Sequence, residues 1–351
     1  MKKLLNTLYI TTQGAWLSRE GETVNVSVER ETKLRIPIHT LSGIVCFGIV
    51  TLTPQLMEMC AENHVNVSFL SEHGKFWAKV QGRVSGNVLL RKEQYRRSDD
   101  LLQSAKIARL IVSVKISNCR TSLLRRLRDK KENESLELVE KAVNYLAFLL
   151  ERLSQMGSNN GGKELNLDSI RGIEGDAART YFGVFDNLIT TQKEAFHFHE
   201  RSKRPPLDNV NALLSFIYTL LAHDVVSALE TVGLDPAVGF LHRDRPGRPG
   251  LALDLMEELR PYLADRLALT LVNRQQVKGS GFKKTETGAV LMDDETRKEL
   301  LVTYQKRKQE EIMHPFIDEK INIGLLPYVQ ATLFARFLRG DLEDYPPFIW
   351  R

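Results

Sequence analysis

Cysteine is scarce in this chain, and the few cysteines present form no recognisable pattern. The 351 residues include Cys46, Cys60 and Cys119, which are widely spaced and form no CxxC pair. An odd, scattered set of this kind argues against both a disulfide framework and a zinc ribbon. A reducing cytoplasm is the simplest setting for such a protein.

Long apolar runs are also lacking. No apolar stretch of the sequence approaches the roughly 18 to 20 residues that a membrane span needs. The N-terminal sequence MKKLLNTLYITTQGAWLS is interrupted by polar residues and lacks a convincing cleavage site, which favours a first β-strand over a signal peptide. Because no G-x-x-x-x-G-K-[ST] loop is present, an ATP requirement is not expected. We therefore expect a soluble, cytoplasmic protein.

A strong charge of either sign is missing as well. The formal net charge is +5, the pI is about 9.0, and 26% of the residues are charged, which is ordinary for a globular protein. The positive sign points toward nucleic acid without establishing it. A hydrophobic content of 42% over 351 residues allows a sizeable core, and this length favours two domains.

The spacing of apolar residues changes along the chain. It alternates in ETVNVSVE and KLRIPI, which predicts a β-rich domain over residues 1–90, with Gly14 and Gly21 at hairpin turns. After the polar stretch RKEQYRRSDD the spacing becomes helical, with a flexible break at MGSNNGGKE and a hairpin near GFKKTETGAVLMDD. We expect helices to resume at about Leu167, Asp208 and Ala252. The predicted class is therefore α+β, with a mainly α-helical second domain over residues 100–351.

Two motifs of the sequence each carry one candidate functional side chain. Glu174 lies among small residues in SIRGIEGDAARTYFGVF, and small neighbours allow close approach of a ligand. Taken alone, it is more often a solvated helix residue. In VGFLHRDRPGRPG, an apolar run leads to His242 at the edge of a basic loop, where an imidazole is well placed to meet phosphate and metal. Taken alone, such a histidine is more often structural.

A helix in LALDLMEELRPYL carries further candidates. It places Asp254 and Glu257 three residues apart, so both carboxylates lie on one face. Two carboxylates on one face repel unless a positive group lies between them. The alternative is a helix start in which acidic first-turn residues complement the macrodipole, with Glu258 simply solvated.

Together, two carboxylates and one imidazole form an incomplete set of ligands that leaves room for water and phosphate oxygens. This arrangement is typical of catalytic Mg²⁺ or Mn²⁺. A zinc hydrolase uses the same ligand types, so the spacing leaves that alternative open.

These segments together resemble the CRISPR-associated protein one family, the integrase that inserts new spacers into CRISPR arrays. The similar stretches are IEGDAARTYF, RPPLDNVNALLSFIYTLL, VGLDPAVGFLHRDRPGRPGLALDLMEELRP and LLPYVQATLFARFLRGDLEDYPPF. The resemblance spans nearly the whole chain and is densest from Leu167 to Arg274. The C-terminal stretch looks like the subtype I-C branch.

The resemblance implies a DNA endonuclease and integrase with Glu174, His242 and Glu257 as metal ligands and Asp254 as an acidic neighbour of that site. The ligand at 257 is a glutamate where some members look to have aspartate. The resemblance also implies a homodimer formed through the β domain and assembly with CRISPR-associated protein two. A partner from the CRISPR-associated protein four nuclease family is a further inference from the subtype resemblance.

Basic side chains surround these candidates in the sequence. Arg243, Arg245 and Arg248 are expected to contact DNA near the metal. Lys278 in NRQQVKGSGFKK is a candidate for contact with the DNA backbone, although a polar surface hairpin explains that segment equally well. Two more remote clusters are further candidates for DNA contact, although each is more often a solvated face than a binding patch. They are Arg125, Arg126, Arg128, Lys130, Lys131 and Arg201, Lys203, Arg204.

Two other functions remain open at this point. A structure-selective nuclease for branched DNA would use the same site with water as the attacking group, and would cleave without joining strands. A non-catalytic DNA-binding scaffold would use the basic clusters alone, and it predicts that Glu174→Ala, His242→Ala and Glu257→Ala leave function intact.

Overall fold

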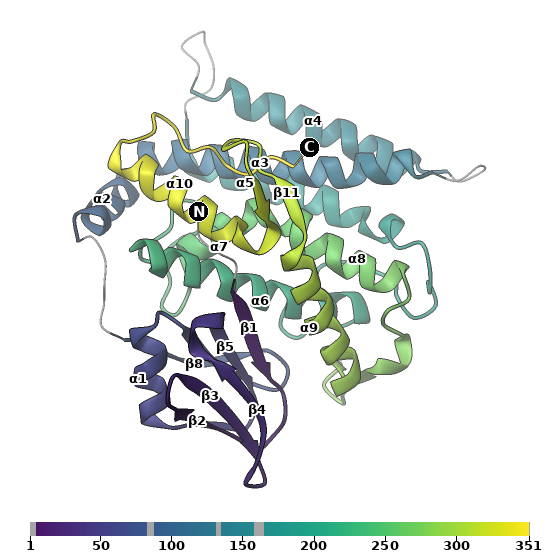
Figure 1. Cartoon of the computed structure of the whole chain (residues 1–351). Coiled ribbons are helices and arrows are strands. Elements are labelled where there is room, and N and C mark those ends of the chain that lie inside the picture. Colours follow the sequence, from purple (N-terminus) through teal and green to yellow (C-terminus); the bar gives the residue numbers. More distant parts are fainter. Residues whose placement is uncertain (1–4, 83–87, 131–134, 158–164, 351) are drawn as a thin grey trace. The chain divides into compact units, whose positions relative to one another are not determined.

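The structure is a computed structural model that describes residues 5–82, 88–130, 135–157 and 165–350 (Figure 1). The chain divides into two compact units. The first comprises Met1–Gly86, Gln305–Glu310 and Asn322–Leu325, and the second comprises Asn87–Tyr304, Glu311–Ile321 and Leu326–Arg351. The first is β-rich and the second mainly helical, which confirms the expected α+β class.

The first unit contains two four-stranded sheets. The strands are β1 Asn6–Ile10, β2 Ala15–Glu20, β3 Thr23–Val28, β4 Glu31–Pro37, β5 Leu41–Phe47, β6 Val50–Leu52, β7 Asn66–Leu70 and β8 Phe76–Val80. In one sheet, ordered β1-β5-β7-β8, the first three strands are parallel and β8 is antiparallel to β7. In the other, ordered β4-β3-β2-β6, only the β2–β6 pair is parallel.

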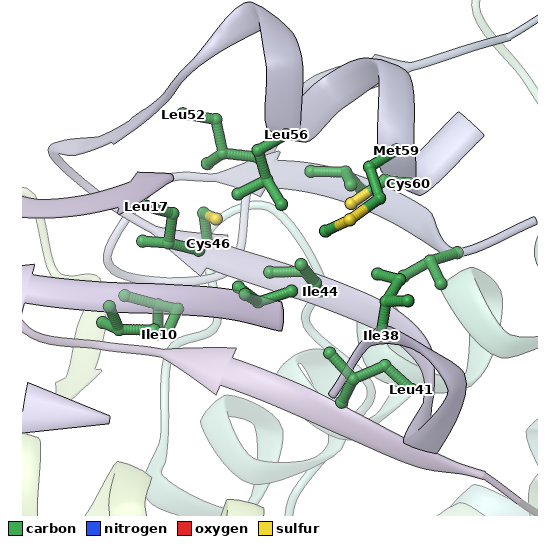
Figure 2. Packing of buried hydrophobic residues seen from close by; sticks show 14 of the residues in the cluster. Ile10, Leu17, Ile38, Leu41, Ile44, Cys46, Leu52, Leu56, Met59 and Cys60 are labelled. Carbon is green, nitrogen blue, oxygen red and sulfur yellow. The ribbon is translucent and has the colours of Figure 1, made fainter. Parts of the chain in front are cut away.

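The core of this unit follows from the alternation in its strands. Leu17 of β2 and Val24 of β3 are fully buried, and they belong to a cluster that extends to Ile44 of β5 and Leu56 of helix α1, Pro54–Glu62 (Figure 2). The side chain of Thr53 caps α1 by accepting a hydrogen bond from the Leu56 N–H. One helix and inward-facing strand residues thus enclose a single apolar cluster.

Two local expectations were wrong. Gly21 does lie in the turn between the paired strands β2 and β3, but Gly14 does not lie in a hairpin, because β1 and β2 belong to different sheets. All but the last residue of the polar stretch RKEQYRRSDD falls within a helix, α2, Val88–Asp99, and that last residue, Asp100, precedes the next helix. Most of the break at MGSNNGGKE, residues 158–164, lies outside the described residues.

The second unit is built mainly from helices (Figure 1). Besides α2, they are α3 Leu101–Arg128, α4 Glu137–Gln155, α5 Leu167–Gly183, α6 Asn209–Val232, α7 Gly250–Leu259, α8 Arg266–Asn273 and α10 Leu326–Arg339. A π-helical segment, Arg260–Asp265, joins α7 to α8. The expected hairpin is formed by β9 Phe282–Lys284 and β10 Val290–Met292. Helix α9, Asp294–Gln309, begins in this unit, and the short strands β11 Glu311–Met313 and β12 Lys320–Asn322 pair after it.

Helix α3 organises the packing of this unit, because it contacts α4, α5 and α7. Asp100 caps its start by accepting hydrogen bonds from two backbone N–H groups, and three arginines occupy its last turn, where they complement the helix dipole. Helix α3 therefore presents its side chains to both α5 and α7, the helices that carry Glu174 and Glu257.

Helix α6 also lies in the core. The expectation that no stretch approaches a membrane span was wrong for this helix, which alone among the described helices is long and apolar enough to cross a membrane. However, 56% of its most apolar window is buried within the protein. It packs against α7 and α10. Its apolar composition is therefore accounted for by contacts within the unit.

Candidate active site

Glu174 lies in the middle of α5, whose start is capped by the side chain of Asn166. Its carboxylate forms an ion pair with the ammonium group of Lys115 on α3, and 28% of its side chain is exposed. A Cβ atom built on Gly172 or Gly175 would meet no other atom within 4 Å. One side of this helix therefore remains open around a half-buried carboxylate.

Glu257 lies on α7 and is almost fully buried, with 2% of its side chain exposed. Its Oε2 atom lies 2.6 Å from Lys115 Nζ, although this oxygen accepts no well-aligned hydrogen bond. Its Oε1 atom accepts a hydrogen bond of 2.5 Å from Arg260 Nη1. Burial alone would raise the pKa of Glu257, but the charges of Arg260 and Lys115 outweigh burial and lower it to about 2. The side chain is therefore a carboxylate at neutral pH.

His242 follows the apolar run and is held by Asp254. Its Nδ1 atom lies 2.6 Å from Asp254 Oδ1, and its Nε2 atom lies 3.8 Å from Glu257 Oε1. Asp254 is fully buried and also accepts hydrogen bonds from the backbone N–H groups of Phe240, Leu241 and His242. Because a carboxylate oxygen accepts hydrogen bonds, a neutral imidazole in this contact carries its proton on Nδ1 and presents the Nε2 lone pair to another partner.

Two glycines allow this close contact between the loop and α7. A Cβ atom on Gly239 would lie 2.7 Å from Asp254 Oδ2, and one on Gly250 would lie 2.6 Å from the carbonyl oxygen of Ala237. Both distances are shorter than a real Cβ tolerates. The sequence VGFLHRDRPGRPG therefore folds against the start of α7 because side chains are absent at these two positions.

The loop is also held from α2. The fully buried Gln94 donates from its amide nitrogen to the carbonyl oxygens of Asp235 and Val238, both at 2.8 Å. Its amide oxygen accepts a hydrogen bond from the Asp235 N–H. Sequence reasoning missed Gln94, because it lies in a polar stretch with little apolar periodicity.

Lys115 is the group that brings the two glutamates together. It lies on α3, 10% of its side chain is exposed, and its ammonium group pairs with both Glu174 and Glu257. Burial would lower the pKa of Lys115, but the two carboxylates outweigh it and raise the pKa above its usual value. The available signal was a single lysine within the apolar segment LIVSVKIS.

The alternative interpretation, in which the acidic residues of α7 lie at the start of the helix, was wrong. The helix begins at Gly250, and its first turn contains no acidic residue. Asp254 and Glu257 both lie beyond that first turn. Glu258, expected to be solvated, is fully buried and accepts hydrogen bonds from the Tyr345 hydroxyl, the Gln330 amide and the Phe348 N–H. It anchors the C-terminal segment rather than facing water.

Further cationic groups lie beside Glu257. The guanidinium groups of Arg201 and Arg260 lie 5.1 and 5.0 Å from the centre of the Tyr218 ring. Lys203 is exposed in the same segment as Arg201. Like charges held together in this way favour an anionic ligand.

The predicted DNA-contacting residues lie in two places, the loop before α7 and the segment before the β9–β10 hairpin. The exposed Arg243 pairs with Asp168 of α5 at 2.9 Å. Arg245 and Arg248 lie in the same loop, where the Arg248 N–H donates to the Arg245 carbonyl oxygen. Lys278 is exposed just before the β9–β10 hairpin.

Two residues of the remote basic run, both on α3, have structural contacts instead. Arg125 stacks on Trp350 at 4.2 Å, and Arg126 donates to the Asn187 carbonyl oxygen. Lys131 of this run lies outside the described residues.

The acidic and imidazole groups suit a divalent cation by their chemistry. Glu174, Glu257 and the free Nε2 atom of His242 supply oxygen and nitrogen donors from α5, α7 and the loop before α7. Within the described part of the chain, however, no three His, Cys, Asp or Glu side chains lie close enough together to enclose an ion as they stand. The cation that pairs with both glutamates is the ammonium group of Lys115.

Comparison with known proteins gives one consistent family. The family model for CRISPR associated protein Cas1 matches residues 8–306. CRISPR-associated endonuclease Cas1 1 of Chlorobaculum tepidum is 54% identical over 351 residues, and Cas1 2 of Rhodospirillum rubrum is 48% identical over 355 residues, each alignment covering 100% of both chains. A Cas4/Cas1 fusion from Rhodospirillum rubrum is 34% identical over 97% of this chain and 57% of the fusion.

Solved structures share the fold. A casposase bound to integration product superposes with a TM-score of 0.80 at 20% identity, covering 97% of this chain and 92% of the casposase chain. A chain of a Cas6-RT-Cas1–Cas2 complex superposes with a TM-score of 0.81 at 22% identity, covering 100% of this chain and 36% of that chain.

Proposed function

The chain belongs to the CRISPR-associated protein Cas1 family, and on that premise we propose that it is a divalent-metal-dependent DNA endonuclease and integrase. Its role would be to insert new spacers into CRISPR arrays in antiviral defence. One observation carries this proposal. Glu174 and Glu257 both pair with the buried ammonium group of Lys115, and His242 Nε2 lies 3.8 Å from Glu257 Oε1.

In this proposal Glu174, His242 and Glu257 hold Mg²⁺ or Mn²⁺. When bound, the metal would neutralise charge on the scissile phosphate and lower the pKa of the attacking hydroxyl. The α3, α5 and α7 helices hold the two glutamates, and burial of Glu257 limits competition from water. Rigid placement of ligands on packed helices is what positional and electrostatic catalysis require.

We assign Asp254 a positioning role rather than a place among the ligands. Both of its oxygens are engaged by three backbone N–H groups and the His242 imidazole. A carboxylate that orients a metal-bound histidine through the other ring nitrogen is a common arrangement.

DNA would be held by basic side chains around this site. Arg245 and Arg248 lie in the loop that carries His242, and Arg243 would exchange its exposed pairing with Asp168 for a phosphate. Lys278 is proposed to contact the backbone farther along. Arg201, Lys203 and Arg260 provide additional positive charge beside Glu257.

The partners follow from the family and from its relatives. We propose that the β-rich residues 1–90 form a homodimer contact and that residues 100–351 act on DNA in the cytoplasm. Assembly with a Cas2 protein is supported by the solved complex that contains Cas1 and Cas2, and cooperation with a Cas4-type nuclease by the Cas4/Cas1 fusion.

Strand transfer tests this function. The purified protein, alone and with a Cas2 partner, is incubated with a labelled short duplex bearing free 3′-hydroxyls and a supercoiled plasmid carrying a leader and a repeat. We expect label to join the plasmid in Mg²⁺ or Mn²⁺ and not in EDTA. Glu174→Gln and His242→Ala should each lower joining by roughly 100-fold or more, because a ligand is lost.

Asp176→Asn is the matched control, because Asp176 lies on α5 near Glu174 but pairs with Arg179. It should join normally. Cleavage without joining would indicate a nuclease that uses water, and joining that survives loss of Glu174 and His242 would refute this site.

A further inference from the structure

Lys115 occupies the position of a cation at this site. Its ammonium group lies within ion-pair distance of both Glu174 and Glu257, although the three residues come from three different helices. The lysine is buried on its own helix between apolar neighbours, so it does not reach the glutamates by chance from the surface.

The pairing has an electrostatic reason. A buried glutamate beside a second carboxylate is costly unless a positive charge lies between them. Lys115 supplies that charge, and Arg260 supplies a second one to Glu257 Oε1. The two carboxylates can therefore both lie against Lys115 when no metal is bound.

A divalent cation requires the same carboxylate oxygens. An ammonium group has three donors and no acceptor, so it cannot act as a ligand and can only compete for those oxygens. A metal ion and an ammonium group a few ångströms apart would also repel each other strongly in a buried site. Metal and ammonium are thus alternative partners of Glu174 and Glu257.

We propose that Lys115 is an intramolecular counter-ion that competes with the divalent metal for Glu174 and Glu257, and that a DNA phosphate receives its ammonium group when the metal binds. This inference rests on the proposed metal-dependent function. The four-carbon stem of lysine allows the ammonium group to move while α3 stays in place. A phosphate brought by DNA would offer the displaced charge a new partner.

The proposal predicts that metal and DNA bind with positive coupling. DNA should tighten metal binding because it stabilises the displaced ammonium group, and metal should tighten DNA binding by the same factor. Without the ammonium group, metal should bind tightly even in the absence of DNA.

The test measures Mn²⁺ affinity directly, by the electron paramagnetic resonance signal of free Mn²⁺, with and without a short duplex whose 3′ ends are blocked. We expect Lys115→Met, which removes the charge and keeps much of the stem, to bind Mn²⁺ about tenfold more tightly or better than the wild type. DNA should tighten Mn²⁺ binding to the wild type and have little effect on Lys115→Met. Lys106→Met is the matched control, because Lys106 is an exposed lysine of the same helix, and it should behave like the wild type.

Each outcome is decisive. Equal or weaker Mn²⁺ binding by Lys115→Met overturns the inference and leaves the proposed function standing, whereas absence of Mn²⁺ binding by every protein overturns both. If Lys115→Met does not fold, the wild type still decides the matter, because Mn²⁺ affinity that DNA does not change contradicts the proposed exchange.

Discussion

Asp254 and Glu257 have different roles although both are acidic residues of α7. Asp254 is saturated by backbone N–H groups and His242, whereas Glu257 faces only cationic side chains and the imidazole. The difference arises from position: Asp254 faces the loop and Glu257 faces α3. The same residue class is therefore used once to orient a side chain and once, in our proposal, to bind metal.

Replacing Asp254 separates these roles. In Asp254→Asn an amide nitrogen replaces one carboxylate oxygen. This nitrogen cannot accept the hydrogen bonds that the backbone N–H groups donate to Asp254, so His242 loses its fixed orientation. We expect Mn²⁺ affinity to fall about 10- to 100-fold, measured by titration, while DNA binding is largely kept. Asp244→Asn, an exposed substitution in the same loop, should leave the affinity unchanged. An unchanged affinity in Asp254→Asn would refute the positioning role.

The buried Asp265 makes the free energy of unfolding depend on pH, and the direction of that dependence follows from its raised pKa. Burial raises its pKa to about 6, although the hydroxyl groups of Tyr218 and Tyr181 and the charges of Arg260 and Arg201 oppose this. A raised pKa means that the folded protein favours the protonated acid. The stabilising contribution is therefore complete below the unfolded pKa of about 4 and is lost as the pH rises through about 6.

Asp265→Asn removes this titration and keeps an acceptor for the Tyr218 hydroxyl. The free energy of unfolding of the wild type, minus that of the variant, should fall by up to about 3 kcal/mol between pH 4 and pH 7. Urea unfolding in EDTA at several pH values measures it. A difference that is independent of pH would contradict this assignment.

Residue roles were only partly predictable from the sequence. Glu174, His242 and Glu257 could be proposed because each lies in a motif of its own, yet Lys115 could not, since it is 59 residues from Glu174 along the chain. Glu258 was misjudged because its partners Gln330, Tyr345 and Phe348 lie in a distant segment. Periodicity within one helix carries no information about such partners.

At the level of elements, the loop before α7 depends on the absence of a side chain at Gly239. A Cβ there would lie 2.7 Å from both Asp254 Oδ2 and the Gly250 carbonyl carbon. We expect Gly239→Ala to lower the free energy of unfolding by about 1–3 kcal/mol, because the backbone must shift. Thermal unfolding measures it. Gly172→Ala, in an open part of α5, should instead be neutral or slightly stabilising; equal effects of the two would contradict the argument.

Elements with strong periodicity were predicted well, and the others were not. Helices α5 and α6, expected at about Leu167 and Asp208, and the β9–β10 hairpin all appear where periodicity and turn residues indicated them. Helix α2 was missed because its few apolar residues form no clear stripe. Gly14 was misassigned because a turn residue does not reveal whether the strands on either side pair with each other.

For the whole molecule, the two units have separate compositions and separate proposed tasks. The first buries one apolar cluster between its strands and α1, and the second carries every acidic and imidazole group of the proposed site. Family membership follows from similarity along the full chain. The assignment of metal ligands rests instead on a few contacts within the second unit.

The most direct test of those ligands is the anomalous scattering of Mn²⁺ in crystals of the protein. We expect one manganese peak within about 2.5 Å of Glu174, Glu257 and His242 Nε2, with the Lys115 ammonium group withdrawn from the two carboxylates. A peak held elsewhere, or none at a Mn²⁺ concentration that supports DNA joining, would contradict the account.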